Sequence, residues 1–285
     1  MAKRLKDQIV VVTGSTRGFG YAIAEAMLRA GATVVVSGRS QVALRTAVNR
    51  LRKLGNVAGI LCDVRRERQV YALARRVVNR FGRIDVWVNN AGYSASAGRI
   101  VETRPEEALD MFMANDMGTL HGTRAALRFM LERKRGTMVN IYGNGSFLRP
   151  ASPTGLYGAT KAWVASFTRS LAKEIEGSGV RLIGFSPGML LTDMLTSPNV
   201  VGTYGDELKK SYGFVLRLLA GSPEKAAERL VAALESDRRQ FSEHRLFKPW
   251  SPLLGLIRIG WENIAGTGKT PEFQLKKIPA YKPRI

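Results

Sequence analysis

The stretch that decides the fold is Thr13-Gly14-Ser15-Thr16-Arg17-Gly18-Phe19-Gly20, which follows the apolar run Ile9 to Val12. Glycines at three of these positions permit a tight turn and a close approach of the backbone to a pyrophosphate. The helix-like segment that begins near Tyr21 supplies free amides and a favourable dipole to the same anion. A glycine-rich loop alone is a weak signal, but its place between a strand and a helix predicts a dinucleotide-binding turn.

The segments after this turn alternate short β-branched runs with longer helix-like stretches. The runs are nearly continuous in apolar residues, which is typical of strands that helices bury on both faces. This alternation predicts parallel crossovers and a single α/β domain with a doubly wound parallel sheet, the Rossmann fold. The six predicted strands are Ile9 to Val12, Thr33 to Ser37, Ala58 to Leu61, Val86 to Asn89, Thr137 to Ile141 and Arg181 to Phe185.

The net charge of +21 over 285 residues is high for a protein that acts on small molecules. Such a charge is compatible with nucleic acid, with an anionic membrane or with acidic ligands as partners. The arginines are spread along the chain, however, and neither an RNA-binding signature nor zinc-ligand spacing is present. We therefore expect a solvated basic surface, with no nucleic-acid partner and no metal.

The compartment is predicted from cysteine usage and from apolar runs. The single cysteine, Cys62, lies in a strand-like run and cannot form an internal disulfide. The charged segment Met1 to Asp7 lacks the apolar core of a signal peptide, and no run approaches the roughly 20 apolar residues that cross a bilayer. A cytoplasmic protein is the default expectation, with peripheral membrane contact left open.

The end of the second predicted strand indicates which nicotinamide cofactor is used. An acidic residue there binds the free ribose 2′-hydroxyl of NAD, whereas arginine accommodates the 2′-phosphate of NADP. The segment Ser37-Gly38-Arg39-Ser40 has no carboxylate. Arg39 is therefore predicted to make a charge-assisted contact with a phosphate, with Arg17 as a second cation, and NADP(H) is the expected cofactor.

With these motifs the chain resembles the short-chain dehydrogenase/reductase family of the usual length. The resemblance runs from about Lys6 to Asp193, with weaker support to Ser236. Besides the glycine turn, the matching motifs are Asp63-Val64, Asn89-Asn90-Ala91-Gly92, Asn115, Tyr157-Gly158-Ala159-Thr160-Lys161 and Pro187-Gly188. Their order and spacing together are highly specific to that family.

The resemblance implies hydride transfer between NADP(H) and a carbonyl or alcohol, with Tyr157 as the acid/base. Lys161 follows it at i+4 and shares its helix face, so the ammonium is expected to lower the pKa of the phenol and to hold the nicotinamide ribose. Asn115 is implied to support a proton relay to that lysine. The implied cofactor-binding residues are Gly14, Ser15, Thr16, Arg17, Gly18, Phe19, Gly20, Arg39, Asp63, Val64, Asn90, Ala91, Gly92, Tyr157, Lys161, Pro187, Gly188 and Thr192.

The loop after the fifth predicted strand departs from the family pattern. The family carries a serine about thirteen residues before the tyrosine, where this chain has Asn144, and the nearest serine is Ser146. Either side chain is a competent donor to the substrate oxygen, with Ser146 slightly favoured. The loop and the following Arg149-Pro150 are similar to the chlorophyll b reductase branch, which suggests a bulky apolar carbonyl. The alternative is a catalytically weakened NADP(H)-binding scaffold or redox sensor, attached to a membrane or free.

The resemblance also places a substrate lid within the predicted domain, residues 1–240. The lid, at about 194–220, is strongly apolar, which favours a large hydrophobic substrate; an ordinary buried helix is an equal alternative for Phe214 to Leu219. A basic, partly apolar C-terminal extension, 241–285, follows. Its stretch Trp250 to Trp261 is predicted either to pack on a partner subunit of a homo-oligomer or over the substrate cleft, or to lie in an anionic membrane interface.

Overall fold

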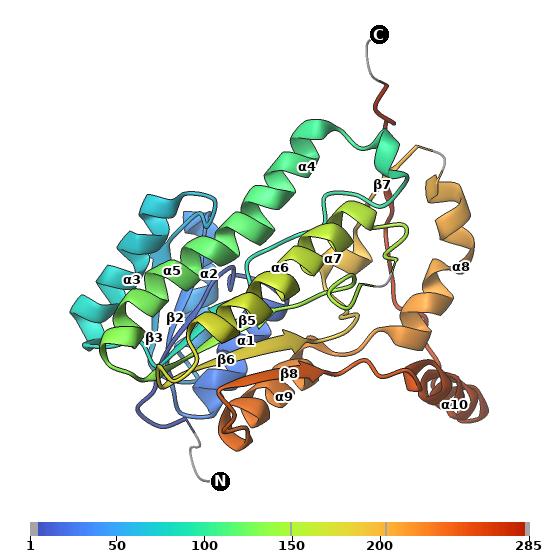
Figure 1. The fold of residues 1–285 in the computed structure, drawn as a ribbon. Coiled ribbons are helices and arrows are strands. Elements are labelled where there is room, and N and C mark those ends of the chain that lie inside the picture. The colour runs from blue at the N-terminus through green and yellow to red at the C-terminus, as the bar shows by residue number, and fades with distance from the viewer. Residues whose placement is uncertain (1–4, 149, 203, 283–285) are drawn as a thin grey trace.

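The computed structural model describes residues 5–148, 150–202 and 204–282. Its main feature is a seven-stranded sheet in the order β3-β2-β1-β4-β5-β6-β8, in which every neighbouring pair is parallel (Figure 1). The strands are β1 (Ile9–Val12), β2 (Thr33–Gly38), β3 (Val57–Leu61), β4 (Val86–Asn89), β5 (Gly136–Ile141), β6 (Val180–Ser186) and β8 (Phe241–Arg245). The predicted doubly wound sheet is confirmed, and the six predicted strands correspond to β1 to β6.

Helices cover both faces of this sheet. Side chains of α1 (Gly18–Arg29), α2 (Gln41–Leu51) and α9 (Pro223–Ser236) fill one core layer. Side chains of α3 (Glu67–Phe81), α5 (Gly118–Glu132) and α6 (Gly155–Glu174) fill the other. The remaining helices are α4 (Pro105–Phe112), α7 (Asp193–Thr196), α8 (Tyr204–Leu219) and α10 (Ser251–Ile264), with a 3-10 turn η1 (Ile100–Glu102) and a π-helical turn η2 (Met113–Met117).

The strand order reverses between β1 and β4. Chain connections leave these two neighbouring strands in opposite directions, so their carboxyl ends open a crevice, the usual ligand position in such sheets. The loops after β1, β4 and β5 therefore meet at one edge of the sheet.

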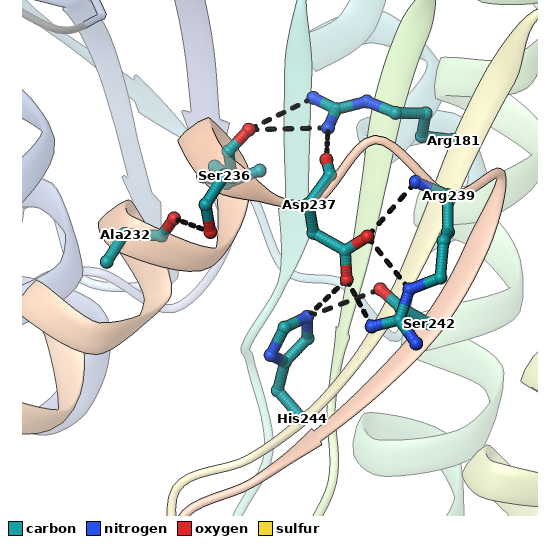
Figure 2. Close-up of polar contacts among 8 residues, drawn as sticks. Arg181, Ala232, Ser236, Asp237, Arg239, Ser242 and His244 are labelled. Carbon is teal, nitrogen blue, oxygen red and sulfur yellow. Dashed lines mark hydrogen bonds and ion pairs between the residues drawn. The ribbon is translucent and has the colours of Figure 1, made fainter.

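Strand β8 extends the sheet past β6 and is attached through the loop before it. The Asp237 carboxylate accepts hydrogen bonds from Arg239, and His244 Nε2 lies 2.8 Å from Asp237 Oδ2 (Figure 2). Arg181 of β6 donates to the Asp237 carbonyl at 2.5 Å. Residues 241–245 are predicted to begin the C-terminal extension, but they form strand β8 of the main sheet. The run contains glutamate, histidine and arginine and lacks the apolar continuity of the other strands, so the sequence does not indicate a strand there.

The rest of the C-terminal extension contacts the segment 194–220, which is predicted to be a substrate lid. Strand β9 (Lys276–Ile278) pairs in parallel with β7 (Asn199–Val201) to form a second, two-stranded sheet. Tyr212 of α8 packs edge-on against Phe273, with 5.2 Å between the ring centroids. The extension and this segment therefore pack together. Arg149 and the last three residues of the basic tail lie outside the described residues.

Candidate active site

The glycine turn after β1 is shaped by close backbone contacts. Gly14 has φ +62°, and a Cβ placed on it would lie 2.8 Å from the Cα of Ala91 in the loop after β4. Helix α1 begins at Gly18, and its N-cap residue, Arg17, makes no capping side-chain hydrogen bond. The first amides of α1 are therefore left for an external anion, as a pyrophosphate site requires.

Most side chains of the turn point into the protein. Ser15 Oγ donates to the Val12 carbonyl at 2.7 Å and accepts from the Ser37 amide at 2.9 Å, which ties the turn to β2. Phe19 stacks on Phe185, with 6.4 Å between the ring centroids. Thr16 lies against Gly38. These predicted residues can therefore meet a cofactor mainly through their backbone.

Two arginines surround the end of β2. Arg39 is exposed and has no ion-pair partner among the residues that the structure describes. Arg17 pairs with Asp193 at 3.3 Å, with both side chains largely exposed. Asp63 is paired with Arg65 at 2.7 Å, and hydrogen bonds from Arg65 hold the pKa of the Asp63 carboxyl below its usual range. Arg39 is thus the cation at this edge that remains available to a ligand.

The loop after β4 is joined to the loop after β1. Asn90 Nδ2 donates to the Thr13 carbonyl at 2.9 Å, and the Ala91 amide donates to Thr13 Oγ1 at 3.1 Å. At Gly92, a Cβ would lie 2.8 Å from Asn115 Oδ1. The backbone carbonyl of Val64, after β3, accepts a hydrogen bond from His121 Nδ1 at 2.9 Å. The predicted cofactor-lining segments therefore converge on one crevice.

Tyr157, Lys161 and Asn115 meet beside this crevice. Lys161 is buried on α6, and its Nζ donates to the Ile141 carbonyl at 3.0 Å and lies 5.7 Å from the centroid of the Tyr157 ring. Asn115 lies in the π-helical turn η2, where it accepts from the Tyr93 amide at 2.9 Å and donates to Thr160 Oγ1 at 3.0 Å. The structure brings together the three residues that sequence reasoning selects for proton transfer.

The electrostatics of the pair differ from the sequence-based expectation. Burial raises the pKa of the Tyr157 phenol to about 12, whereas the i+4 spacing predicts a lowered pKa. Burial also lowers the pKa of Lys161 to about 8, with Asp116 acting in the opposite direction. The difference arises because the phenol is buried, and the spacing of the two residues along the helix does not report that burial.

Asp116 is a buried acid that sequence reasoning missed. Its side chain is 1% exposed, and its Oδ1 has no hydrogen-bond partner among the described residues. Burial raises its pKa to about 7, while the positive charge of Lys161 lowers it. The sequence feature that could have identified Asp116 is a carboxylate directly after Asn115, between residues that the helix buries. Asp116 therefore titrates near neutrality beside the Tyr157 and Lys161 pair.

The two polar side chains of the loop after β5, Asn144 and Ser146, differ in burial. Ser146 is buried, donates its hydroxyl proton to the Lys161 carbonyl at 2.9 Å and accepts from the Gly143 amide at 3.1 Å. Asn144 is exposed. The position that faces the phenol is Gly143, where a Cβ would lie 2.6 Å from Tyr157 Oη. The hydroxyl of Ser146 is thus engaged with backbone groups, and the residue beside the phenol has no side chain.

The segment after β6 crosses to the glycine turn. Pro187 and Gly188 follow β6, and Gly188 has φ +79°. Thr192 Cγ2 would lie 3.7 Å from a Cβ on Gly18. A cleft of about 410 Å³ lies between the loop after β4, helix α4 and strand β7. It is lined by Tyr93, Ala95, Glu106, Glu107, Leu109, Asp110 and Asn199, and its acidic side chains all come from α4.

Comparison with known families and sequences supports these observations. The family model for short chain dehydrogenases matches residues 8–200. A protein of rice named chlorophyll(ide) b reductase NOL is 37% identical over 230 residues, and its Arabidopsis counterpart is 35% identical over 229 residues. Each match covers 78% of this chain but only 65% and 64% of the plant proteins, so the chain spans slightly less than two thirds of their length. An uncharacterized oxidoreductase of Staphylococcus epidermidis is 35% identical over 68% of this chain and 82% of its own length.

Solved structures show the same architecture. A short-chain dehydrogenase of Streptomyces avermitilis is 29% identical, with a TM-score of 0.72 over 92% of this chain and 98% of its own. Levodione reductase is 25% identical, with a TM-score of 0.76 over 86% and 98% of the two chains. A metagenomic short-chain oxidoreductase in complex with NADP is 27% identical, with a TM-score of 0.68 over 85% and 97%.

Proposed function

The chain belongs to the short-chain dehydrogenase/reductase family, and on that premise we propose that it is an NADP(H)-dependent carbonyl reductase or alcohol dehydrogenase for a bulky apolar substrate. The family is one of nicotinamide-dependent oxidoreductases. The observation that carries the proposal is the meeting of Tyr157, Lys161 and Asn115 beside the glycine turn.

The residues of the crevice fit a nicotinamide dinucleotide. The Gly14 contact with Ala91 leaves no room for a side chain, and the uncapped start of α1 offers amides to a pyrophosphate. We assign Arg39, with Arg17, to the 2′-phosphate, because no acid is available to bind a free ribose 2′-hydroxyl there. Lys161 is assigned to the nicotinamide ribose and Thr192 to the carboxamide. When bound, NADPH supplies the hydride.

The protein's part in the reaction is to orient the substrate and to supply a proton. Tyr157 Oη gives its proton to the oxygen of the carbonyl as that oxygen becomes an alkoxide, and recovers it through Lys161 and water. A phenol with a pKa of about 12 stays protonated near neutral pH, so it has a proton to give to the more strongly basic alkoxide. Because the proton of Ser146 is donated to the Lys161 carbonyl, we assign the second donor to the substrate oxygen to Asn144.

The bulk of the substrate is inferred from the similar plant proteins. These two relatives are named for chlorophyll(ide) b, which is a bulky and largely apolar molecule. Their names favour a large carbonyl compound over a small sugar or hydroxy acid. Gly143 contributes differently, because the phenol of Tyr157 packs so closely on it that a Cβ would lie 2.6 Å from Tyr157 Oη.

The direct test replaces the proton donor. Tyr157→Phe is expected to lower turnover of a responsive carbonyl substrate by about 10²–10⁴-fold, because general acid catalysis is lost. NADPH affinity, measured by fluorescence titration, should stay within about threefold of wild type, because the phenol adds little to binding. The matched control is Tyr71→Phe on α3, away from the crevice. Unchanged turnover in Tyr157→Phe would refute the assigned role.

A second candidate is an NADP(H)-binding scaffold or redox sensor with weakened catalysis. It is favoured by Gly143, which removes a side-chain donor from the neighbourhood of the phenol, and by the raised pKa of Tyr157. Saturable NADPH binding without turnover of any member of a broad panel of aldehydes and ketones would support this candidate over the enzyme.

Two predictions on organisation complete the proposal. We propose that copies of the chain form a homo-oligomer, to be checked by light scattering coupled to gel filtration. We also propose that the C-terminal extension begins after Arg245, since residues 241–245 form strand β8.

A further inference from the structure

Helix α10 carries an uncovered apolar stripe on its outward face. Figure 1 shows this helix at the periphery, beside α8 and away from the main sheet. The exposed fractions of the stripe residues are 58% for Trp250, 59% for Leu253, 56% for Leu254, 51% for Ile257, 69% for Trp261 and 82% for Ile264. Their spacing of three and four residues places them on one side of an α-helix. The stripe is therefore a continuous surface.

The opposite side of α10 is fixed to the protein. Gly255 and Ile259 are buried, and Gly255 allows the helix to approach the Leu218 carbonyl of α8 closely. Arg217 of α8 pairs with Glu262 at 3.0 Å, and Arg258 also lies near Glu262 at 3.6 Å. The helix is thus held in a defined orientation, with its apolar residues presented outward.

The charge around the stripe is positive. Glu262 is the only acidic residue of α10, and it is neutralised on the inner side by the two arginines. From Arg245 to Ile285, with Arg245 included, the sequence has eight lysines or arginines and two glutamates. Lys248 and Lys269, which flank the helix, are both exposed. An apolar stripe between cations is complementary to a surface with apolar depth and negative headgroups.

A second copy of this chain is a poorer occupant. Two copies paired stripe to stripe would bring the exposed Lys248 and Lys269 of each copy together, so the proposed homo-oligomer is expected to use another face of the molecule. The helix itself has 14 residues, about 21 Å at 1.5 Å per residue. Within the described ranges, no helix has the length and hydropathy to cross a membrane. A position in the plane of an interface is the arrangement that these dimensions allow.

We propose that α10 docks the protein on an anionic lipid bilayer, with the Trp250 to Ile264 stripe inserted among headgroups and upper acyl chains. The exposed tryptophans at both ends of the stripe suit the interface, where one part of an indole is apolar and its N–H finds a polar partner. This inference stands apart from the proposed reaction and does not depend on it.

The test is flotation of the full chain with vesicles of phosphatidylcholine alone or mixed with phosphatidylglycerol. Wild type should bind the anionic vesicles, lose this binding in high salt and show a blue shift of tryptophan emission. Ile257→Glu should weaken the binding by roughly tenfold or more, because it places a charge within the inserted stripe. The matched control is Val42→Glu on α2, which makes the same charge change at a side chain that is 76% exposed.

Circular dichroism and NADPH affinity serve as folding controls for both variants. Absence of wild-type binding to anionic vesicles would overturn the proposal, as would equal binding by Ile257→Glu and Val42→Glu. Self-association of wild type that Ile257→Glu abolishes, without binding to vesicles, would show instead that the stripe is an interface between copies. None of these outcomes bears on turnover, so a failure here leaves the proposed function unaffected.

Discussion

Two glycine-containing loops, one after β1 and one after β5, lie at the same edge of the sheet but use glycine in different ways. In the first loop, Gly14 is required because the backbone of Ala91 occupies the space of a side chain. In the second loop, the space at Gly143 is bounded by the phenol of Tyr157. The first loop is thus constrained by backbone contacts and the second by the side chain of Tyr157, the predicted proton donor.

Among the variants that compare the two loops, the largest effect is expected when a side chain is added to a glycine of the first loop. Gly20→Ala would place a methyl group against the Gly14 carbonyl and the Asn90 amide. We expect NADPH affinity to fall about tenfold to 100-fold, since overpacking displaces the turn. The control is Gly260→Ala on α10, where the added Cβ would meet nothing within 4 Å. Equal affinities in fluorescence titration would contradict the backbone role of the turn.

Arg39→Asp tests the predicted contact between Arg39, which follows β2, and the 2′-phosphate of NADPH. Loss of a charge-assisted contact should weaken NADPH binding by about tenfold or more relative to NADH. The ratio of kcat/KM for the two cofactors measures the change, with exposed Arg45→Asp on α2 as the control for net charge. If the ratio does not move, the 2′-phosphate is recognised elsewhere.

A pair of alanine variants in the second loop separates an effect on stability from an effect on catalysis. Ser146→Ala should lower the free energy of unfolding by about 1–3 kcal/mol, because it leaves the Gly143 amide and the Lys161 carbonyl without their partner. Asn144→Ala should keep stability within about 0.5 kcal/mol, since the residue is exposed, and should lower kcat about tenfold. Urea unfolding and steady-state kinetics give the two readouts. A fall in kcat without loss of stability in Ser146→Ala would restore the serine as the donor.

The last prediction concerns Asp116, whose buried carboxyl interacts with the charge of Lys161. Its pKa of about 7 means that the folded protein keeps a proton that the unfolded chain releases from about pH 4 upward. Wild-type stability therefore falls as pH rises through this window, and the free energy of unfolding of Asp116→Asn should rise relative to wild type by roughly 1–4 kcal/mol. Urea unfolding at both ends of the window measures the difference, and a constant difference would show that the carboxyl does not titrate there.

The sequence was sufficient for the fold because the determining interactions are local or periodic. Continuous apolar runs located β1 to β6, and the glycine turn located the start of α1. Strand β8 was missed because it lies at the edge of the sheet, and its residues, Phe241–Arg245, combine one aromatic side chain with polar ones. An edge strand has no second neighbour and does not need a continuous apolar run.

The sequence predicted which residues form the site, but it did not predict their pKa values or hydrogen-bond partners. The spacing of Tyr157 and Lys161 correctly placed both on α6, but the direction of the ammonium depends on the Ile141 carbonyl of another strand. In the same way, the burial of Ser146 and Asp116 results from packing between segments distant in sequence. Such contacts determine pKa values and hydrogen-bond partners, and no local pattern reports them.

The pairing of β7 with β9 has a practical consequence for protein engineering. Strand β7 belongs to the segment predicted to cover the substrate, so a tag or fusion placed beyond β9 would load this pairing. A purification handle is therefore better placed before Met1.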